Sequence, residues 1–285
     1  MSSAPPFERL IRFQEQDGQS IRYGDLPLVV PNDGIIGGSV EVLNGDIQSG
    51  FQKAGTKAAV GKLLSPLPSA SIILCIGLNY RQHATEANLT VPTLPVVFCK
   101  PPDALAGPFD NIHVHPEAQS QLDYEGELTV VIGSDAKNVK AADALDYVLG
   151  YTVGNDLSAR NYQRPPTVSG GQYCYAKSFD SFAPVGPCLI AAPLVDPQQL
   201  HFVTTVNGQV RQKTSTSDMI WTVRQIIEHL SRGTTLRRGT HIMTGTPSGV
   251  GLFMEPQASG FLKHGDVVEI EMEKIGSIKN QIVFD

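Results

Sequence analysis

The sequence predicts an α+β fold that is rich in β-strands. Short apolar runs bounded by turn residues occur along most of the chain, whereas only a few segments have a helical period. Strands and helices do not alternate regularly, so a parallel βαβ sheet is not expected. The chain has 285 residues, which suits one large domain or one domain with a smaller appendage.

The first 65 residues are predicted to form a small, β-rich N-terminal domain. The pattern LIRFQEQDGQSIRYG predicts a hairpin whose turn is Asp17-Gly18. The segment SPLPSAS, residues 65–71, contains two prolines and three serines and predicts a linker. Residues 70–285 then form the larger domain.

The larger domain is predicted to contain mostly short strands. Strands are expected at 72–77, 96–100, 128–133, in LGYTVGNDLS, and in HIMTGTPSGVG before its Gly-rich loop. Hairpins are expected in HFVTTVNGQVRQ, with its turn at Asn207-Gly208, and in DVVEIEMEKIGSIKNQIVF. Helices are expected from Asn79 into the 80s, at 141–148 and at 222–232, where Val223, Ile226, Ile227 and Leu230 have a helical period.

Composition excludes several classes of function. The net charge of −6 does not provide the basic field of a nucleic-acid-binding protein. No apolar run approaches the roughly 18 residues that span a bilayer, so no membrane partner is expected. The N-terminus carries early acids and lacks the apolar core of a secretory signal. A cytoplasmic protein is therefore expected, and a mitochondrial location stays open.

The four cysteines, Cys75, Cys99, Cys174 and Cys188, have no paired spacing. Cys75 and Cys99 lie within apolar runs that resemble strands, IILCIG and VVFCK. We interpret them as small buried hydrophobic residues in a reducing compartment, rather than as part of a disulfide or zinc framework.

Three acids lead into an apolar strand in QLDYEGELTVVIG, residues 121–133. Asp123, Glu125 and Glu127 are two apart, and side chains two apart on a strand share a face. Asp156 ends another apolar strand, where an ionised carboxylate is costly unless it is paired or metal-bound. Such carboxylates, without a run of basic residues beside them, suit Mg²⁺, Mn²⁺ or Ca²⁺. The alternative is that Glu125 and Glu127 lie on the solvent-facing side of an edge strand.

Two further groups are candidates for chemistry. On a helix, His83 and Glu86 would be neighbours, and the carboxylate would orient the imidazole; a fortuitous surface pair is the alternative. Lys177 either faces a substrate oxyanion or forms a surface salt bridge with Asp180, three residues later. The loop TGTPSGVG, 244–251, offers amides and hydroxyls that could hold an anion, and it lacks the Walker pattern.

Together, in this order, the motifs resemble the fumarylacetoacetate hydrolase superfamily. They are IGLNYRQHATE, VVFCKPPDALAGPFD, LDYEGELTVVIG, GYTVGNDLSARNYQ, AKSFDSFAPVGP, VNGQVRQ and MTGTPSGVG. The match covers about residues 70–285, and the C-terminal LKHGDVVEIEMEKIGSIKNQIV resembles the domain-containing members of the superfamily. The resemblance implies a mixed β-roll catalytic domain with a small N-terminal domain, usually in a homodimer.

The resemblance also implies roles for individual residues. Glu125, Glu127 and Asp156 match a Glu-x-Glu…Asp site for Mg²⁺ or Mn²⁺, which Ca²⁺ could fill in a crystal, and Asp123 is expected in a structural salt bridge. The matching catalytic residues are His83 and Glu86, on a mobile lid, and Lys177, which faces the substrate. The matching substrate-binding residues are Lys100, Arg160, Gln163 and Thr246. Asn161 stands where an acid commonly follows the arginine, which bears on how Arg160 is oriented.

These parts imply an enzyme that acts on small 2-oxo acids, such as oxaloacetate or acylpyruvates, through a metal-bound enolate. His83 would then move a proton. Hydrolysis of a C–C bond, tautomerisation and decarboxylation can all proceed from that enolate. Two alternatives stay open. One is hydrolysis of a larger 1,3-diketo acid, such as fumarylacetoacetate, in aromatic catabolism or a specialised pathway. The other is an inactive family member that only binds metal or a partner.

Overall fold

The computed structural model describes residues 5–28, 34–256 and 259–285. Residues 1–4 and 29–33, which belong to the predicted N-terminal domain, lie outside the described residues. The described chain forms one eleven-stranded sheet, one five-stranded sheet and two pairs of short strands. The predicted β-rich α+β class is therefore confirmed. In these ranges, no helix has the length and apolar character needed to cross a membrane.

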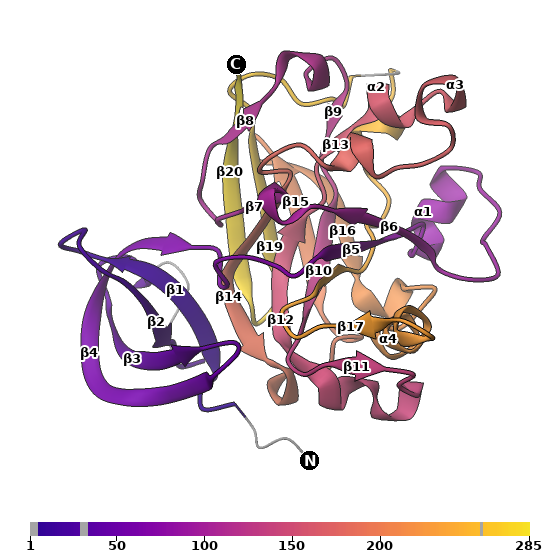
Figure 1. Cartoon of the computed structure of the whole chain (residues 1–285). Coiled ribbons are helices and arrows are strands. Elements are labelled where there is room, and N and C mark those ends of the chain that lie inside the picture. The colour runs from indigo at the N-terminus through magenta and orange to yellow at the C-terminus, as the bar shows by residue number, and fades with distance from the viewer. Residues whose placement is uncertain (1–4, 29–33, 257–258) are drawn as a thin grey trace.

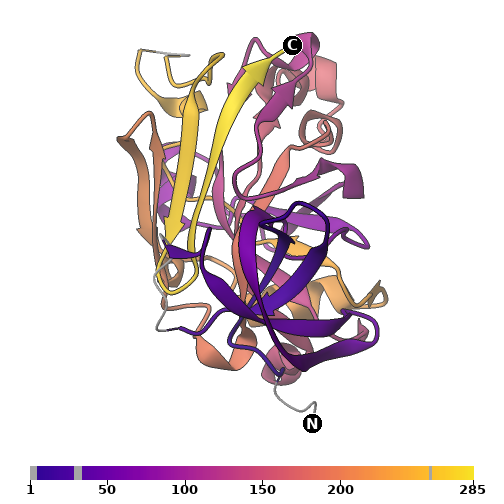
Figure 2. The same cartoon turned by 90° about the vertical axis from the view of Figure 1, so that its left-hand side faces the viewer.

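The first four strands close into a small barrel, because each pairs antiparallel with two of the others. They are β1 (Arg9–Glu15), β2 (Ile21–Asp25), β3 (Ser39–Asp46) and β4 (Gly50–Leu64). The predicted hairpin at Asp17-Gly18 is β1–β2. Figure 1 shows the barrel as a lobe beside the larger body, and Figure 2 shows it in front of that body. The division at residues 65–70 stays a prediction.

The barrel continues into the large sheet, because β1 also pairs with β14. The remaining strands of this sheet are β5 (Ile73–Gly77), β6 (Val96–Lys100), β7 (Leu105–Ala106), β10 (Gly126–Ile132), β12 (Val148–Asn155), β14 (Ala183–Ala191) and β18 (His241–Met243). From β14 the order is β12, β10, β18, β5 and β6, and β7 pairs separately with β14. The predicted strands in this part of the chain are all present.

The second sheet has the order β16, β15, β19, β20 and β8. Its strands are β8 (Ile112–Val114), β15 (His201–Val206), β16 (Gln209–Ser215), β19 (Val267–Met272) and β20 (Gly276–Phe284). Both predicted hairpins, β15–β16 and β19–β20, are confirmed. The two short pairs join β9 (Leu122–Asp123) to β13 (Ser158–Ala159) and β11 (Ala136–Lys137) to β17 (Thr235–Leu236).

The main core lies between the two sheets. Leu128 and Val130 of β10 belong to one buried cluster with Ile270 of β19 and Ile278 and Ile282 of β20. Burial of each such side chain contributes about 1.5–3 kcal/mol to folding. This packing fixes the positions of β10 and β12, at whose ends the acidic residues lie.

Four α-helices occur in the described chain: α1 (Arg81–Glu86), α2 (Arg160–Gln163), α3 (Pro166–Ser169) and α4 (Val223–Ser231). α4 begins with a capping box between Thr222 and Gln225 and buries the predicted apolar face. The helix predicted at 141–148 is present as a 3₁₀ helix, Ala141–Tyr147, and it ends where β12 begins at the next residue.

Candidate active site

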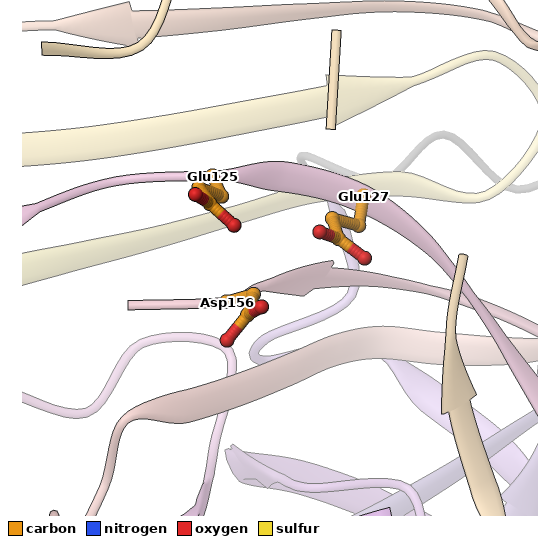
Figure 3. Close-up of side chains that lie close together, drawn as sticks. All are labelled: Glu125, Glu127 and Asp156. Atoms are coloured by element: carbon orange, nitrogen blue, oxygen red, sulfur yellow. The ribbon is translucent and has the colours of Figure 1, made fainter. Parts of the chain in front are cut away.

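Three carboxylates converge where β10 and β12 pair. Antiparallel pairing sets Glu127 opposite Gly154, and Asp156 directly follows β12. Ligand oxygens of Glu125, Glu127 and Asp156 lie within 4.8 Å of one another, and Figure 3 shows the three side chains around a common space. Their exposures are 6%, 1% and 0%, so the solvent-facing alternative for the two glutamates is wrong.

The expectation that Asp123 shares a face with these acids is wrong. The strand is interrupted at residues 124–125, and Asp123 lies on β9, where it pairs with Ser158. Its Oδ1 accepts a hydrogen bond from the Gly251 N–H (2.7 Å), and its Oδ2 accepts one from Arg160 Nε (2.8 Å). Asp123 therefore forms the predicted structural salt bridge and is not one of the three converging acids.

Basic residues distant in sequence reach the acids. Lys177 Nζ donates to Glu125 Oε2 and Asp156 Oδ2, each at 2.7 Å, and Arg160 Nη2 donates to Glu125 Oε1 at 2.6 Å. Lys177 is 1% exposed, so the alternative of a surface salt bridge with Asp180 is wrong. The sequence has no basic run beside the acids, yet in the folded site Lys177 and Arg160 neutralise part of their charge.

The two glutamates have opposite electrostatic environments. Burial alone would raise the pKa of Glu125, but the charges of Lys177 and Arg160 outweigh burial and lower that pKa to about 2. Burial, together with the charges of Asp156 and Glu125, raises the pKa of Glu127 well above its ordinary value. Burial would lower the pKa of Lys177, but Asp156 and Glu125 raise it above its ordinary value.

The donor set fits a hard divalent cation. Asp156 Oδ1 forms a buried ion pair with Lys100 Nζ at 2.6 Å, and Lys100 also donates to the carbonyl oxygens of Leu157, Lys177 and Phe182. Glu127, by contrast, has no ion pair among the described residues, and two other carboxylates face it. Three converging carboxylates, one of them with its charge disfavoured, suit Mg²⁺ or Mn²⁺.

The loop after β18 holds Glu127 in place. The Gly245 N–H donates to Glu127 Oε2 at 2.7 Å, and this is the one hydrogen bond that Glu127 accepts among the described residues. Gly245 has a φ of +99°, and a Cβ there would lie 2.6 Å from Asn79 Cβ. Glycine is therefore required for this close approach to the carboxylate.

His83 and Glu86 form the predicted pair on α1. His83 Nδ1 lies 2.9 Å from Glu86 Oε2, and Glu86 Oε1 accepts the Gly249 N–H at 2.9 Å. The imidazole packs edge-on against Phe253, with 5.8 Å between ring centroids. The loop that donates the Gly249 N–H to Glu86 also donates the Gly245 N–H to Glu127, which places the pair beside the acids. The arrangement argues against a fortuitous surface pair.

The residues predicted to bind substrate lie in or beside this network. Arg160 donates to Asp123, Glu125 and, through Nη1 at 2.7 Å, Gln163 Oε1. Asn161, which stands where an acid was expected, does not orient Arg160; it donates to the Glu117 carbonyl oxygen. The acid that orients Arg160 is Asp123.

The fourth predicted binding residue, Thr246, donates its hydroxyl to the Gly126 carbonyl oxygen at 3.1 Å. Because Lys100, Arg160 and Thr246 already have protein partners, substrate contact by these residues and by Gln163 stays a prediction.

Three polar residues that support the site were not predicted. Gln212 Oε1 accepts the Gly126 N–H at 3.0 Å, and Asn155 Oδ1 accepts the Glu125 N–H at 3.0 Å. Asn79 Nδ2 donates to the Thr244 carbonyl oxygen at 2.6 Å. A signal for Gln212 was available, because it occupies an inward-facing position of an alternating strand.

A cavity of about 640 Å³ lies away from the acids, between the barrel and the end of β14. Phe7, Val40 and Leu194 provide apolar walls. Its charged side chains include Lys53, which lies 3.0 Å from Glu41 and is therefore already paired. This cavity brings together none of the predicted site residues.

Comparison with known protein families agrees with this geometry. A model described as "Fumarylacetoacetate (FAA) hydrolase C-terminal" matches residues 72–283, most of the chain. The chain belongs to the fumarylacetoacetate hydrolase family. The match begins within the strand-rich body that follows the barrel and includes both the three acids and the His83–Glu86 pair.

Two relatives in the family share high sequence identity with the chain. The Bos taurus protein named oxaloacetate tautomerase FAHD2A, mitochondrial, is 42% identical over 221 residues, which cover 77% of this chain and 69% of the relative. The Bacillus subtilis protein named oxaloacetate tautomerase YisK is 44% identical over 225 residues, which cover 78% of this chain and 73% of the relative.

Solved structures extend the likeness to the whole fold. The crystal structure named 2-hydroxyhepta-2,4-diene-1,7-dioate isomerase, from Mycobacterium marinum, has a TM-score of 0.81 and 35% sequence identity. The match covers 98% of this chain and 99% of that chain. The barrel is therefore shared with this structure, whereas the family model begins only at residue 72.

Proposed function

We propose that the protein interconverts the enol and keto forms of oxaloacetate, or of a closely similar small 2-oxo acid, with a divalent cation at Glu125, Glu127 and Asp156. The observation that carries the proposal is the buried acid group with the His83–Glu86 pair beside it. The names of the bovine and bacterial relatives support the choice of oxaloacetate.

The charges of the site suit an anionic substrate. Four buried carboxylates and three buried cations give a formal charge of −1; they are Asp123, Glu125, Glu127, Asp156, Lys100, Arg160 and Lys177. A divalent cation would bring this sum to +1. A positively charged, buried site favours binding of a carboxylate substrate and disfavours neutral ketones.

The cation, His83 and Lys177 would each have a separate role in the reaction. The cation, when bound, polarises the oxo acid and stabilises negative charge on oxygen. His83 shares its Nδ1 proton with Glu86, so Nε2 is the nitrogen that can take a proton from carbon and return it. Lys177, at 2.7 Å from Glu125 and Asp156, adds positive charge at the same place.

The test follows loss of enol absorbance and formation of pyruvate from oxaloacetate, with Mg²⁺ and with EDTA. We expect Mg²⁺-dependent loss of the enol without pyruvate. His83→Gln should lower the rate by about 10²–10⁴-fold, the usual contribution of a general acid or base, and leave Mg²⁺ affinity unchanged. His113→Gln is the matched control, because His113 forms a 2.8 Å pair with Asp285 on the surface.

Other outcomes would redirect the assignment. Pyruvate formed at the rate of enol loss would indicate a decarboxylase. No acceleration of oxaloacetate with retained Mg²⁺ binding would favour a larger substrate, such as the diketo acids or the dienedioate in the name of the mycobacterial structure. Normal turnover in His83→Gln would contradict the proposed role of the pair. The homodimer and cytoplasmic location implied earlier stay predictions.

A further inference from the structure

Two cysteines from distant parts of the sequence are in contact beside the site. Cys99 Sγ, on β6, lies 3.8 Å from Cys174 Sγ, which precedes the 3₁₀ helix Tyr175–Lys177. Both are partly exposed, whereas Cys75 and Cys188 are buried. The expectation that Cys99 is a buried hydrophobic residue is therefore wrong, and a small oxidant can reach this pair.

The two cysteines differ in how firmly the backbone holds them. Cys99 lies within β6, where it is paired with Leu74 in the β5–β6 ladder. Cys174 lies outside the sheets, soon after Gly170 and Gly171, whose φ values are +62° and +82°. A disulfide has an S–S distance of about 2.05 Å, shorter than the present separation. Closing the bond would therefore move the segment of Cys174 toward β6.

Lys177 would move with that segment. Its backbone N–H donates to the Cys174 carbonyl oxygen at 3.1 Å, and its Nζ bridges Glu125 and Asp156. The ammonium also lies 4.9 Å from the ring centroid of Phe98, the neighbour of Cys99. A shift of Cys174 toward β6 therefore changes the position of Lys177 relative to the acids.

We propose that Cys99 and Cys174 form a reversible disulfide that displaces Lys177 and slows turnover. With oxidised glutathione as oxidant, one cysteine thiolate attacks a glutathione sulfur and releases one glutathione thiolate. The second cysteine attacks the protein sulfur of the mixed disulfide and releases the other. Two protein thiols are oxidised and one small disulfide is reduced to two thiols. The effect on turnover rests on the proposed function; formation of the bond does not.

The experiment equilibrates the full-length, Mg²⁺-loaded protein in buffers of defined oxidised-to-reduced glutathione ratio. Free thiols are then blocked with N-ethylmaleimide, and peptides are analysed by mass spectrometry without reduction. We expect a crosslinked peptide containing Cys99 and Cys174, with the mass of two hydrogen atoms lost. Oxaloacetate turnover should fall by about tenfold or more, as expected for a misplaced active-site group, and dithiothreitol should restore it.

The variants separate the two parts of the proposal. Cys99→Ser and Cys174→Ser should each keep full turnover in oxidised buffer, and Cys188→Ala, which retains the pair, should respond like the parent protein. Glutathione adducts without the crosslink would overturn the disulfide. A crosslink with unchanged turnover would overturn the displacement of Lys177. If the reduced protein does not act on oxaloacetate, the proposed function fails, and the peptides still decide whether the bond forms.

Discussion

At the scale of single residues, Glu125 and Glu127 have the same side chain and opposite surroundings. Glu125 accepts hydrogen bonds from Lys177 and Arg160, whereas Glu127 accepts one backbone N–H and faces two other carboxylates. A buried charge without a counter-ion lowers stability, and a paired buried charge lowers stability when its partner is removed. The charges of the two glutamates therefore have different effects on the stability of the metal-free fold.

Glu127→Gln should raise the stability of the metal-free protein and remove Mg²⁺-dependent turnover. The neutral amide relieves repulsion among three buried acids, for which we expect a gain of about 1 kcal/mol, within the range of other stabilising substitutions. Glu125→Gln should instead destabilise by about 3 kcal/mol, because it leaves Lys177 and Arg160 short of a buried counter-charge. Urea unfolding in EDTA measures both. Equal effects of the two substitutions would contradict this account.

His241 provides a prediction for pH. It is buried in β18, and its Nδ1 lies 3.0 Å from the Gly239 carbonyl oxygen. Burial lowers the pKa of His241 from 6.5 to about 4. Between these values the unfolded chain binds a proton that the folded protein does not, so stability falls as the pH falls. From pH 7 to 5 the loss should be about 2 kcal/mol.

Urea unfolding of the parent protein and of His241→Gln, in EDTA at each pH, isolates this contribution. As the pH falls from 7 to 5, the free energy of unfolding of the variant should fall less than that of the parent protein. The remaining decrease, which carboxylates cause, should be the same in both proteins. Parallel pH profiles for the two proteins would show that His241 does not contribute.

At the scale of elements, the loop after β18 links the three acids to α1. Gly245 donates to Glu127, Gly249 donates to Glu86, and Thr246 bonds to the Gly126 carbonyl oxygen. One short loop therefore sets the position of one of the three acids and of the His83–Glu86 pair. Substitutions in it should affect both metal affinity and turnover.

Gly245→Ala should destabilise the protein by about 3 kcal/mol, because the left-handed backbone and the contact with Asn79 Cβ both oppose a Cβ. Mg²⁺ affinity should fall with it, since the N–H to Glu127 shifts. Gly208→Ala is the matched control: its φ is +76° and a Cβ there meets nothing within 4 Å. Thermal unfolding and Mg²⁺ titration compare the two. Similar losses in both variants would mean that the contact with Asn79 is unimportant.

Local sequence patterns predicted most elements of the larger domain, because alternation and turn residues act over a few residues. The helix at 222–232 and the turn at Asn207-Gly208 are examples. The break at residues 124–125 was not predicted, since it depends on Asp123 bonding to Arg160 and to the Gly251 N–H. Such contacts have no local signature.

At the scale of the whole molecule, the sequence predicted the three acids but not that Arg160 and Lys177 are their counter-ions, because the resemblance implied only substrate contacts for these two residues. The ion pairs of Arg160 with Glu125, and of Lys177 with Glu125 and Asp156, join residues 35, 52 and 21 apart. Spacing alone cannot show that such segments meet. Closure of β1–β4 into a barrel and its pairing with β14 were likewise not predicted, because they depend on strand order.

Metal binding should stabilise the entire fold. A ligand that binds the folded state at 100 times its Kd adds about 2.7 kcal/mol to the free energy of unfolding. Mg²⁺ should therefore raise the Tm by several degrees in the parent protein and leave Asp156→Asn unchanged, while EDTA reverses the rise. Differential scanning calorimetry measures the effect. An equal rise in Asp156→Asn would place the bound ion elsewhere.

The pairing of β1 with β14 has a consequence for self-association. Leu10 and Arg9 cover the backbone of β14 at Leu189 and Ile190, on a nine-residue strand that is buried throughout. A chain that began after the barrel would leave the C-terminal end of β14, residues 189–191, with unpaired backbone groups on this edge, a template for aggregation. The barrel thus covers an apolar edge of the large sheet, and its removal should yield insoluble protein.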